Sequence, residues 1–226
     1  MPTLKWLQEE FHYGYRSGNI LSVFPSLQRL REERIVGGSY KKVFRQGLLP
    51  YLKTGDNVLE LGPGAGSWSR AILKHIPNGK LTTVDFQEVS AWLKPEKYED
   101  RLSCIKVEDN SFDAVENNCF DVFWSFGVLC HNNSSTILEI LSNALPKMKS
   151  GGYAIHQYGD WVKLEKWGWA NGKVPIEFKN KPDDEIWWPR NNQEKMCNIA
   201  INAGWEVVSS DLGLIERDSI ILLRAK

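Results

Sequence analysis

A glycine-rich stretch that follows a short apolar run carries the most specific chemical pattern in this sequence. Gly62, Gly64 and Gly66 come directly after the apolar run at 58–61, and a helical pattern follows them. Glycines let the backbone bend sharply and approach a ligand closely, and a helix that follows presents free N–H groups. We therefore expect a nucleotide-like ligand at this turn. The dinucleotide pattern is weakened because Ser67 stands where its third glycine would be, and a P-loop is excluded because no Gly-Lys-Ser/Thr follows.

Acidic residues follow the next two predicted strands. Asp85 ends the strand predicted at 80–84, about 20 residues beyond the glycines, where a carboxylate can accept hydrogen bonds from both ribose hydroxyls. Glu108 and Asp109 follow the strand predicted at 102–106. Asp109 can accept from an adenine amino group, and Glu108 is the less favoured candidate. The alternatives are that Asp85 caps a helix and that the Glu108–Asp109 pair forms a solvated turn.

These residues together resemble the class I S-adenosylmethionine-dependent methyltransferases. The first motif of that family is matched position by position by Glu60, Gly62, Gly64 and Gly66. Further matches follow along the chain at Asp85, Glu108, Asp109, 120–122 and 149–152. The resemblance covers about residues 56–158, and the predicted C-terminal hairpin is similar to the last two strands of the family.

The resemblance implies a cofactor and a set of residues that bind it. The cofactor is S-adenosyl-L-methionine, and Glu60 is expected to bind the amino end of its methionine moiety directly or through water. The expected cofactor-binding residues are Glu60, Gly62, Gly64, Gly66, Asp85, Phe86, Glu108, Asp109, Ser125 and Phe126.

Methyl transfer requires a nucleophile that is held in line and relieved of its proton. His131 falls on a histidine that follows a short apolar turn after strand four in the family, so we expect it to be the base. The alternative is that His131 is structural and packs against the cofactor or caps the next helix. Tyr158 is the second catalytic candidate, and His156 points to the same face by strand alternation. Alternatively, His156 is buried in the middle of its strand.

Two family patterns are absent. No Asn/Asp-Pro-Pro-Tyr/Phe follows strand four, which argues against methyltransferases that act on bases or glutamine. Ser125 stands where a magnesium-dependent catechol-type site has Asp. The four cysteines form no C-x-x-C pair and the four histidines show no ligand spacing with them, so we expect no metal.

A tryptophan-rich stretch at 159–191 is expected to be a lid over the acceptor. It contains five of the ten tryptophans, at positions 161, 167, 169, 187 and 188. Indoles stack on sugar or aromatic rings and attract cations, and Arg190 can grip a carboxylate or phosphate. The alternative is a lid with its own apolar core. The expected substrate-binding residues are Tyr13, Tyr15, His156, Trp161, Trp187, Trp188 and Arg190, with Arg16 beside them.

The elements that position these residues alternate between short apolar runs and helical patterns, which predicts an α/β fold. We expect a Rossmann-like, mostly parallel sheet of seven strands with a C-terminal antiparallel hairpin. The strands are predicted at 57–61, 80–84, 102–106, 120–124, 153–157, 205–208 and 219–223, and the helices at 4–13, 25–33, 39–52, 134–149 and 192–203. The expected single domain divides into an N-terminal helical cap (1–52), a cofactor-binding core (53–158), the lid insertion (159–191), and a C-terminal helix and hairpin (192–226).

Composition narrows the possible partners. The 226 residues include 28 basic and 28 acidic side chains and no basic run, so nucleic acid and anionic membrane are disfavoured. No apolar stretch approaches the roughly 20 residues of a membrane span. We expect a cytoplasmic monomer or homodimer acting on a small-molecule acceptor.

The favoured activity is methyl transfer to an oxygen of a polar small molecule such as a sugar, a nucleotide-sugar or a secondary-metabolite intermediate. One alternative is N-methylation of a small amine. A nicotinamide-dependent oxidoreductase is disfavoured by the glycine spacing and by the lack of a Tyr-x-x-x-Lys pair. A catalytically silent module that binds a cofactor or a partner is the last alternative.

Overall fold

The computed structural model describes residues 18–226 of the chain. The helix predicted at 4–13 and the predicted site residues Tyr13, Tyr15 and Arg16 lie outside the described residues. No helix within 18–226 is long and apolar enough to cross a membrane.

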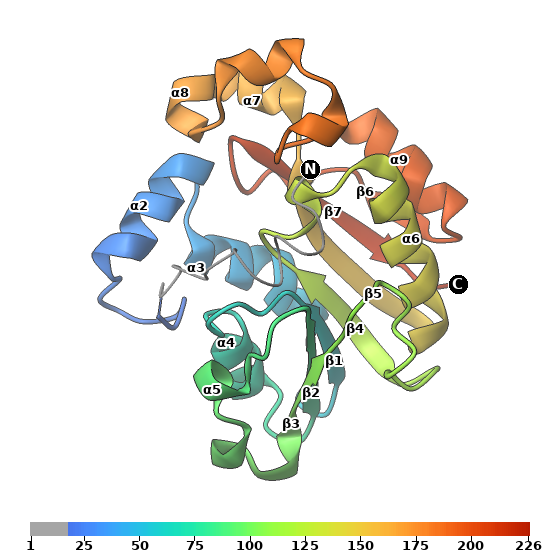
Figure 1. Cartoon of the computed structure of the whole chain (residues 1–226). Helices are drawn as coiled ribbons and strands as arrows, with labels where there is room; N and C mark the ends of the chain where they lie inside the picture. The colour runs from blue at the N-terminus through green and yellow to red at the C-terminus, as the bar shows by residue number, and fades with distance from the viewer. Residues whose placement is uncertain (1–17) are drawn as a thin grey trace.

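Seven strands form one sheet in the order β3-β2-β1-β4-β5-β7-β6 (Figure 1). The first five strands are parallel, and β7 runs antiparallel to both of its neighbours. Their bounds are β1 (Asn57–Leu61), β2 (Lys80–Asp85), β3 (Leu102–Lys106), β4 (Phe120–Ser125), β5 (Met148–Gly159), β6 (Glu206–Ser209) and β7 (Asp218–Arg224). The predicted Rossmann-like, mostly parallel sheet of seven strands is therefore confirmed.

The last two strands form the expected C-terminal antiparallel hairpin. β7 lies between β5 and β6, so β6 is the edge strand. The apolar run of β7 is fully buried up to its last residue, whereas β6 is half-exposed. The more apolar strand therefore takes the interior position, where both faces are covered.

The strand order reverses between β1 and β4, because β2 and β3 lie on one side of β1 and β4 and β5 lie on the other. In open α/β sheets, ligands bind in the crevice at the carboxyl ends of the strands at such a reversal. The fold therefore places one candidate crevice at the ends of β1 and β4.

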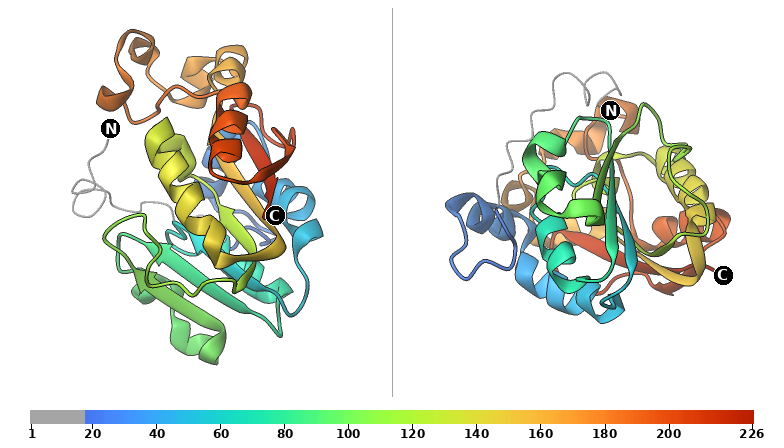
Figure 2. Two further views of the ribbon diagram at one scale, coloured as in Figure 1. Left: turned by 90° about the vertical axis from the view of Figure 1, so that its right-hand side faces the viewer. Right: turned by 90° about the horizontal axis from the view of Figure 1, so that it is seen from below.

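Helices cover both faces of the sheet (Figure 2). Residues of α3, α4 and α5 pack on one face, and residues of α6 and α9 pack on the other. The α-helices of the described residues are α2 (Leu27–Val36), α3 (Tyr40–Val43), α4 (Ser69–His75), α5 (Ser90–Leu93), α6 (Ser134–Ala144), α7 (Trp161–Trp167), α8 (Trp169–Gly172) and α9 (Gln193–Asn202). Short 3-10 turns are η2 (Leu49–Tyr51), η3 (Pro95–Lys97), η4 (Glu99–Arg101), η5 (Leu129–His131), η6 (Leu145–Lys147), η7 (Ile176–Asn180) and η8 (Asp183–Glu185).

Two predicted helices are shorter than expected because each contains a proline. The helix predicted at 134–149 ends at Ala144, a 3-10 turn with Pro146 follows, and β5 already begins at Met148. The segment at 39–52 is α3, then a π-helical turn, η1 (Phe44–Leu48), and then η2 with Pro50. Proline has no N–H to donate and clashes with the preceding turn, so a regular helix does not continue through it.

The tryptophan-rich insertion is ordered as α7, α8, η7 and η8, although its sequence shows no clear periodicity (Figure 1). It has a small core of its own, and among residues 18–226 Cys130 from the η5 turn is the one buried member from outside the insertion. The buried members are Cys130, Leu164, Trp169, Val174, Phe178, Ile186 and Trp188. The insertion is thus partly a packed unit and partly, as shown below, a cavity wall.

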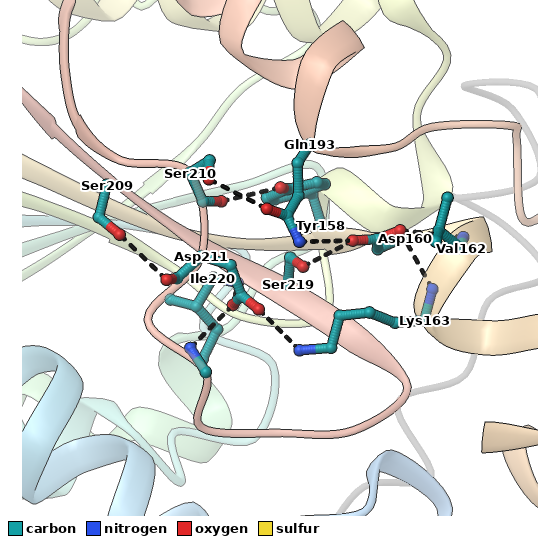
Figure 3. Close-up of polar contacts among 11 residues, drawn as sticks. Tyr158, Asp160, Val162, Lys163, Gln193, Ser209, Ser210, Asp211, Ser219 and Ile220 are labelled. Carbon is teal, nitrogen blue, oxygen red and sulfur yellow. Dashed lines mark hydrogen bonds and ion pairs between the residues drawn. The ribbon is translucent and has the colours of Figure 1, made fainter. Parts of the chain in front are cut away.

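Hydrogen bonds fix the insertion to the sheet at its base (Figure 3). The Asp160 carboxylate accepts from the backbone N–H groups of Val162 and Lys163, which caps α7, and its other oxygen accepts from Ser219 Oγ at 2.8 Å. The N–H of Trp161 also donates to the carbonyl of Asn191 at 2.9 Å. The two ends of the insertion are therefore joined to each other.

Candidate active site

A cavity of about 510 Å³ opens where the parallel strands end. It runs from the glycine turn after β1, past the ends of β2, β3 and β4, to the underside of the tryptophan-rich insertion. We call the part beside the glycine turn the cofactor end, and the part lined by α2, η5, the insertion and Arg217 the lid end.

The glycine turn bends as the sequence predicts. Gly62, Gly64 and Gly66 have φ angles of 67°, 54° and 78°, in the left-handed region that favours glycine. A Cβ on Gly62 would lie 2.4 Å from Val128 Cγ2, so the turn packs directly on the segment after β4. Gly62 and Gly64 line the cavity, whereas Gly66 packs behind it against Arg70.

The acidic residues at the end of β2 and after β3 differ in whether they line the cavity. Asp85 is buried at the end of β2 and lines the cavity with Phe86, and its Oδ1 accepts from the N–H of Gln87. Asp109 also lines the cavity, and hydrogen bonds from Ser111 hold the pKa of its carboxyl below the usual range. Glu108 does not line the cavity.

Glu60 lies beneath the glycine turn. Its side chain is 1% exposed and its Oε2 accepts from Ser69 Oγ at 2.6 Å, at the start of α4. Burial raises its pKa to about 7, and the nearby charge of Asp85 adds to the shift while Ser69 and Arg70 oppose it. Glu60 therefore joins β1 to α4 and does not itself line the cavity.

Ser125, the last residue of β4, and Phe126, which follows it, point to opposite faces of the sheet. Phe126 lines the cavity, where its ring lies 4.7 Å from that of Trp68 and 5.1 Å from that of Tyr40. Ser125 points to the opposite face, where its Oγ lies 2.8 Å from His156 Nδ1 and both residues are fully buried.

The structure places neither His156 nor Tyr158 in the cavity. Burial lowers the pKa of His156 to about 3, and its ring packs edge-on against Phe123. The Tyr158 hydroxyl donates to the carbonyl of Ser210, and burial raises its pKa. The two residues share a face, as alternation requires, but that face packs against α6 and α9. Gln157, from the opposite face, lines the cavity instead.

His131 lies in η5 at the lid end of the cavity. Its Nδ1 lies 2.9 Å from the carbonyl oxygen of Trp187, and because a carbonyl only accepts, Nδ1 carries the proton. Nε2 is then an acceptor. Desolvation beneath the insertion lowers the pKa of His131, and the charge of Arg217 lowers it further. The imidazole is therefore neutral at pH 7 and able to accept a proton.

The four predicted lid residues separate into two pairs. Trp187 and Trp188 line the cavity. Trp161 and Arg190 do not: the guanidinium of Arg190 lies 4.8 Å from the Trp161 ring and pairs with Asp183 on the outer side of the insertion.

Comparisons with known proteins identify the family of this chain. A family model described as a methyltransferase domain matches residues 31–210. The chain belongs to this methyltransferase family. No curated protein sequence matches it.

Solved methyltransferase structures share its fold. A SAM-dependent methyltransferase from Aquifex aeolicus is 19% identical, with a TM-score of 0.61 over 86% of this chain and 93% of that one. A geranyl diphosphate C-methyltransferase from Streptomyces coelicolor A3(2) is 9% identical, with a TM-score of 0.63 over 83% and 78% of the two chains. A SAM-dependent methyltransferase structure from Methanosarcina mazei is 13% identical, with a TM-score of 0.57 over 77% of this chain and 94% of that one.

The class I methyltransferase predicted from the sequence is confirmed by the family match and by the strand order. The protein is an enzyme, and S-adenosyl-L-methionine is its cofactor. Within residues 18–226, no group of three or more metal-ligating side chains could hold a metal ion.

Sequence analysis missed several residues that line the methyltransferase cavity. They are Glu32, Tyr40, Asn110, Phe112, Gln157, Lys173 and Arg217. Arg217 had a usable signal, because it directly precedes the predicted antiparallel strand β7. An antiparallel strand begins at the edge of the sheet where its parallel neighbours end, so a residue just before β7 belongs at the active-site edge.

Proposed function

We propose that this methyltransferase acts on a hydroxyl oxygen of a polar small molecule bound at the lid end of the cavity. The observation that carries the proposal is the His131 tautomer, since the Trp187 carbonyl fixes the proton on Nδ1 and leaves Nε2 to accept another. A hydroxyl, unlike a carboxylate, must lose a proton as it attacks, so it benefits from a neutral imidazole beside it.

The cofactor end fits S-adenosylmethionine, which supplies an electrophilic methyl group. The Gly62 and Gly64 backbone at positive φ allows close approach, and Asp85 offers a buried carboxylate for the ribose hydroxyls. Asp109 and Asn110 supply polar groups for the adenine, and Phe112 supplies an apolar wall.

The lid end performs three tasks. Trp187 and Trp188 cover the acceptor and exclude water. Tyr40, Trp68 and Phe126 form a packed aromatic wall along the same cavity. The attacking hydroxyl would transfer its proton to Nε2 of His131 as the C–O bond to the methyl group forms and the methyl–sulfur bond breaks with S-adenosylhomocysteine as the leaving group, which would avoid a free alkoxide in the cavity.

The direct test is transfer of a labelled methyl group to matched alcohols and amines over a range of pH. We expect label on oxygen, with a rate that rises from acid pH and levels off below pH 6.5, because the pKa of His131 is lowered and its neutral form accepts the proton. Label on nitrogen alone, or a rate independent of pH between 4 and 7, would overturn the proposal.

One observation favours N-methylation of an amine as the second candidate function. Glu32 is a buried carboxyl that lines the lid end, in contact with Tyr40, and aromatic faces and a carboxylate together suit an ammonium group. Burial raises the pKa of Glu32, which weakens this candidate because a protonated carboxyl attracts a cation less. The labelled alcohol and amine panel separates the two.

A further inference from the structure

Arg217 is a nearly buried cation in the wall of the acceptor cavity. It is 9% exposed, directly precedes β7 and lines the lid end. Its Nε and Nη2 donate to Asp218 Oδ2 at 2.9 and 2.8 Å, and its Nη1 donates to the carbonyl of Gly172 at 3.1 Å. The guanidinium carbon lies 4.3 Å from the centre of the Trp188 ring. Arginine rarely lies this far from water without a partner on every side.

The hydrogen bonds of Arg217 leave donors unused. A guanidinium has five N–H groups, and the three hydrogen bonds that Arg217 makes within residues 18–226 use one on each nitrogen. One N–H therefore remains on Nη1 and one on Nη2, the two terminal nitrogens. Such a pair matches the two oxygens of a carboxylate.

Lys173 supplies a second cation at the same end of the cavity. It ends α8 with a left-handed backbone, lines the cavity and has no ion-pair partner among residues 18–226. Because Asp218 neutralises Arg217, Lys173 contributes the unbalanced positive charge of this pair of cations. One unbalanced charge suits a monoanion better than a phosphate dianion.

Arg190, which lies in the insertion, is a structural arginine with which Arg217 can be compared. It too lies against a tryptophan, Trp161, and pairs with an aspartate, Asp183. Its Nη2, however, lies within hydrogen-bond distance of three backbone carbonyls, and it does not line the cavity. The sequence suggested that Arg190 grips an anion, but Arg217 is the arginine whose position in the cavity wall fits that role.

We propose that Arg217 and Lys173 form an anion subsite, so that the acceptor is a hydroxylated monocarboxylate. The proposal rests on the proposed function, because it assigns the far end of the molecule whose hydroxyl reaches His131. His131 and Arg217 both contact Trp188, the first with ring centres 5.1 Å apart. Because both groups lie against the same indole and line the same cavity, one compact acceptor can reach both.

The test compares 3-hydroxybenzoate with 3-hydroxybenzamide, which have nearly the same shape and differ in charge. Binding of each to the enzyme loaded with S-adenosylhomocysteine is measured by calorimetry. We expect the carboxylate to bind about tenfold tighter or more, because it gains charged hydrogen bonds. The preference should disappear in Arg217→Gln, weaken in Lys173→Gln and remain in Arg190→Gln, the matched control.

Arg217→Gln leaves the buried Asp218 unpaired, so its folding is checked with the double variant Arg217→Gln/Asp218→Asn, which removes both charges. Arg217→Lys keeps the charge and loses the two-nitrogen fork, so we expect a partial preference. Equal binding of the two probes, no binding of either, or a preference that survives in the double variant would overturn the anion subsite. Failure of the wild-type chain to bind S-adenosylhomocysteine would instead contradict the proposed function.

Discussion

The two ends of the cavity are built in different ways. The cofactor end is lined by residues at or shortly after the ends of β1, β2, β3 and β4, among them Gly62, Asp85 and Asp109. The lid end draws on α2, on η5, on the insertion and on Arg217 before β7. The first end is local in sequence and the second exists only after distant segments pack. If the proposed function holds, donor binding and acceptor choice are carried by separable parts of the chain.

The largest effect should come from the base at the lid end. His131→Asn keeps an N–H that can donate to the Trp187 carbonyl but has no basic nitrogen, so we expect kcat to fall by about 10²–10⁴-fold. Single-turnover kinetics measure this loss, and calorimetry should show unchanged affinity for S-adenosylhomocysteine. A variant with wild-type kcat would show that His131 is a packing residue and that the lid end of the cavity supplies no base at this position.

The two lid tryptophans should behave differently. Trp188 is 2% exposed in the insertion core, so Trp188→Ala should reduce the free energy of unfolding by about 3–5 kcal/mol. Trp187 is 37% exposed, and Trp187→Ala should cost less than about 1 kcal/mol while raising the acceptor KM. Denaturant melts and steady-state kinetics on both variants measure these effects. Equal stability losses with unchanged KM would mean that neither indole serves the acceptor.

Glu60 predicts a pH effect on stability at the cofactor end. Its folded-state pKa is raised from 4.5 to about 7, so the native state retains a proton that the unfolded chain has lost. For this group, stability should therefore be highest below pH 4.5 and should decline by about 2 kcal/mol between pH 5 and pH 7. Chemical denaturation at pH 5 and pH 7 measures the difference, and Glu60→Gln should flatten it. A difference that is unchanged in Glu60→Gln would assign it to another group.

The effect of Asp85 should be confined to cofactor affinity. Asp85→Ala loses hydrogen bonds from the ribose hydroxyls to a charged acceptor, so we expect S-adenosylhomocysteine to bind about tenfold more weakly, equivalent to about 1.4 kcal/mol. The melting temperature of the ligand-free variant is the control for folding. Unchanged affinity would move ribose recognition to another residue.

The sequence predicted the local parts of this molecule well. The bounds of β1 and β3 agree with the prediction, since β1 is a buried run that ends at the glycine turn and β3 is a short strand followed closely by Glu108 and Asp109. Asp85 ends β2 and Asp109 lies shortly after β3, and strand direction alone sends them to the cavity edge. The helix predicted at 134–149 failed because its apolar period was followed through Pro146, which should have ended it.

The lid end of the cavity was harder to predict because it depends on tertiary packing. Alternation correctly grouped His156 with Tyr158, but only the packing of α6 and α9 decides that their face is buried. Arg190 and Arg217 are equally plausible anion clamps by residue type. Which one lines the cavity depends on where the insertion folds relative to β7, and no local pattern records that.

The hydrogen bond between the Trp161 N–H and the Asn191 carbonyl makes the insertion tolerant of changes in its length. Because the ends of the loop are already held together, the cost of closing it grows only slowly as residues are added between them. Residues between these two positions can therefore be gained or lost with little displacement of β5 or α9. The range of acceptors can diversify by exchange of this one segment, while the machinery that binds the methyl donor is inherited unchanged.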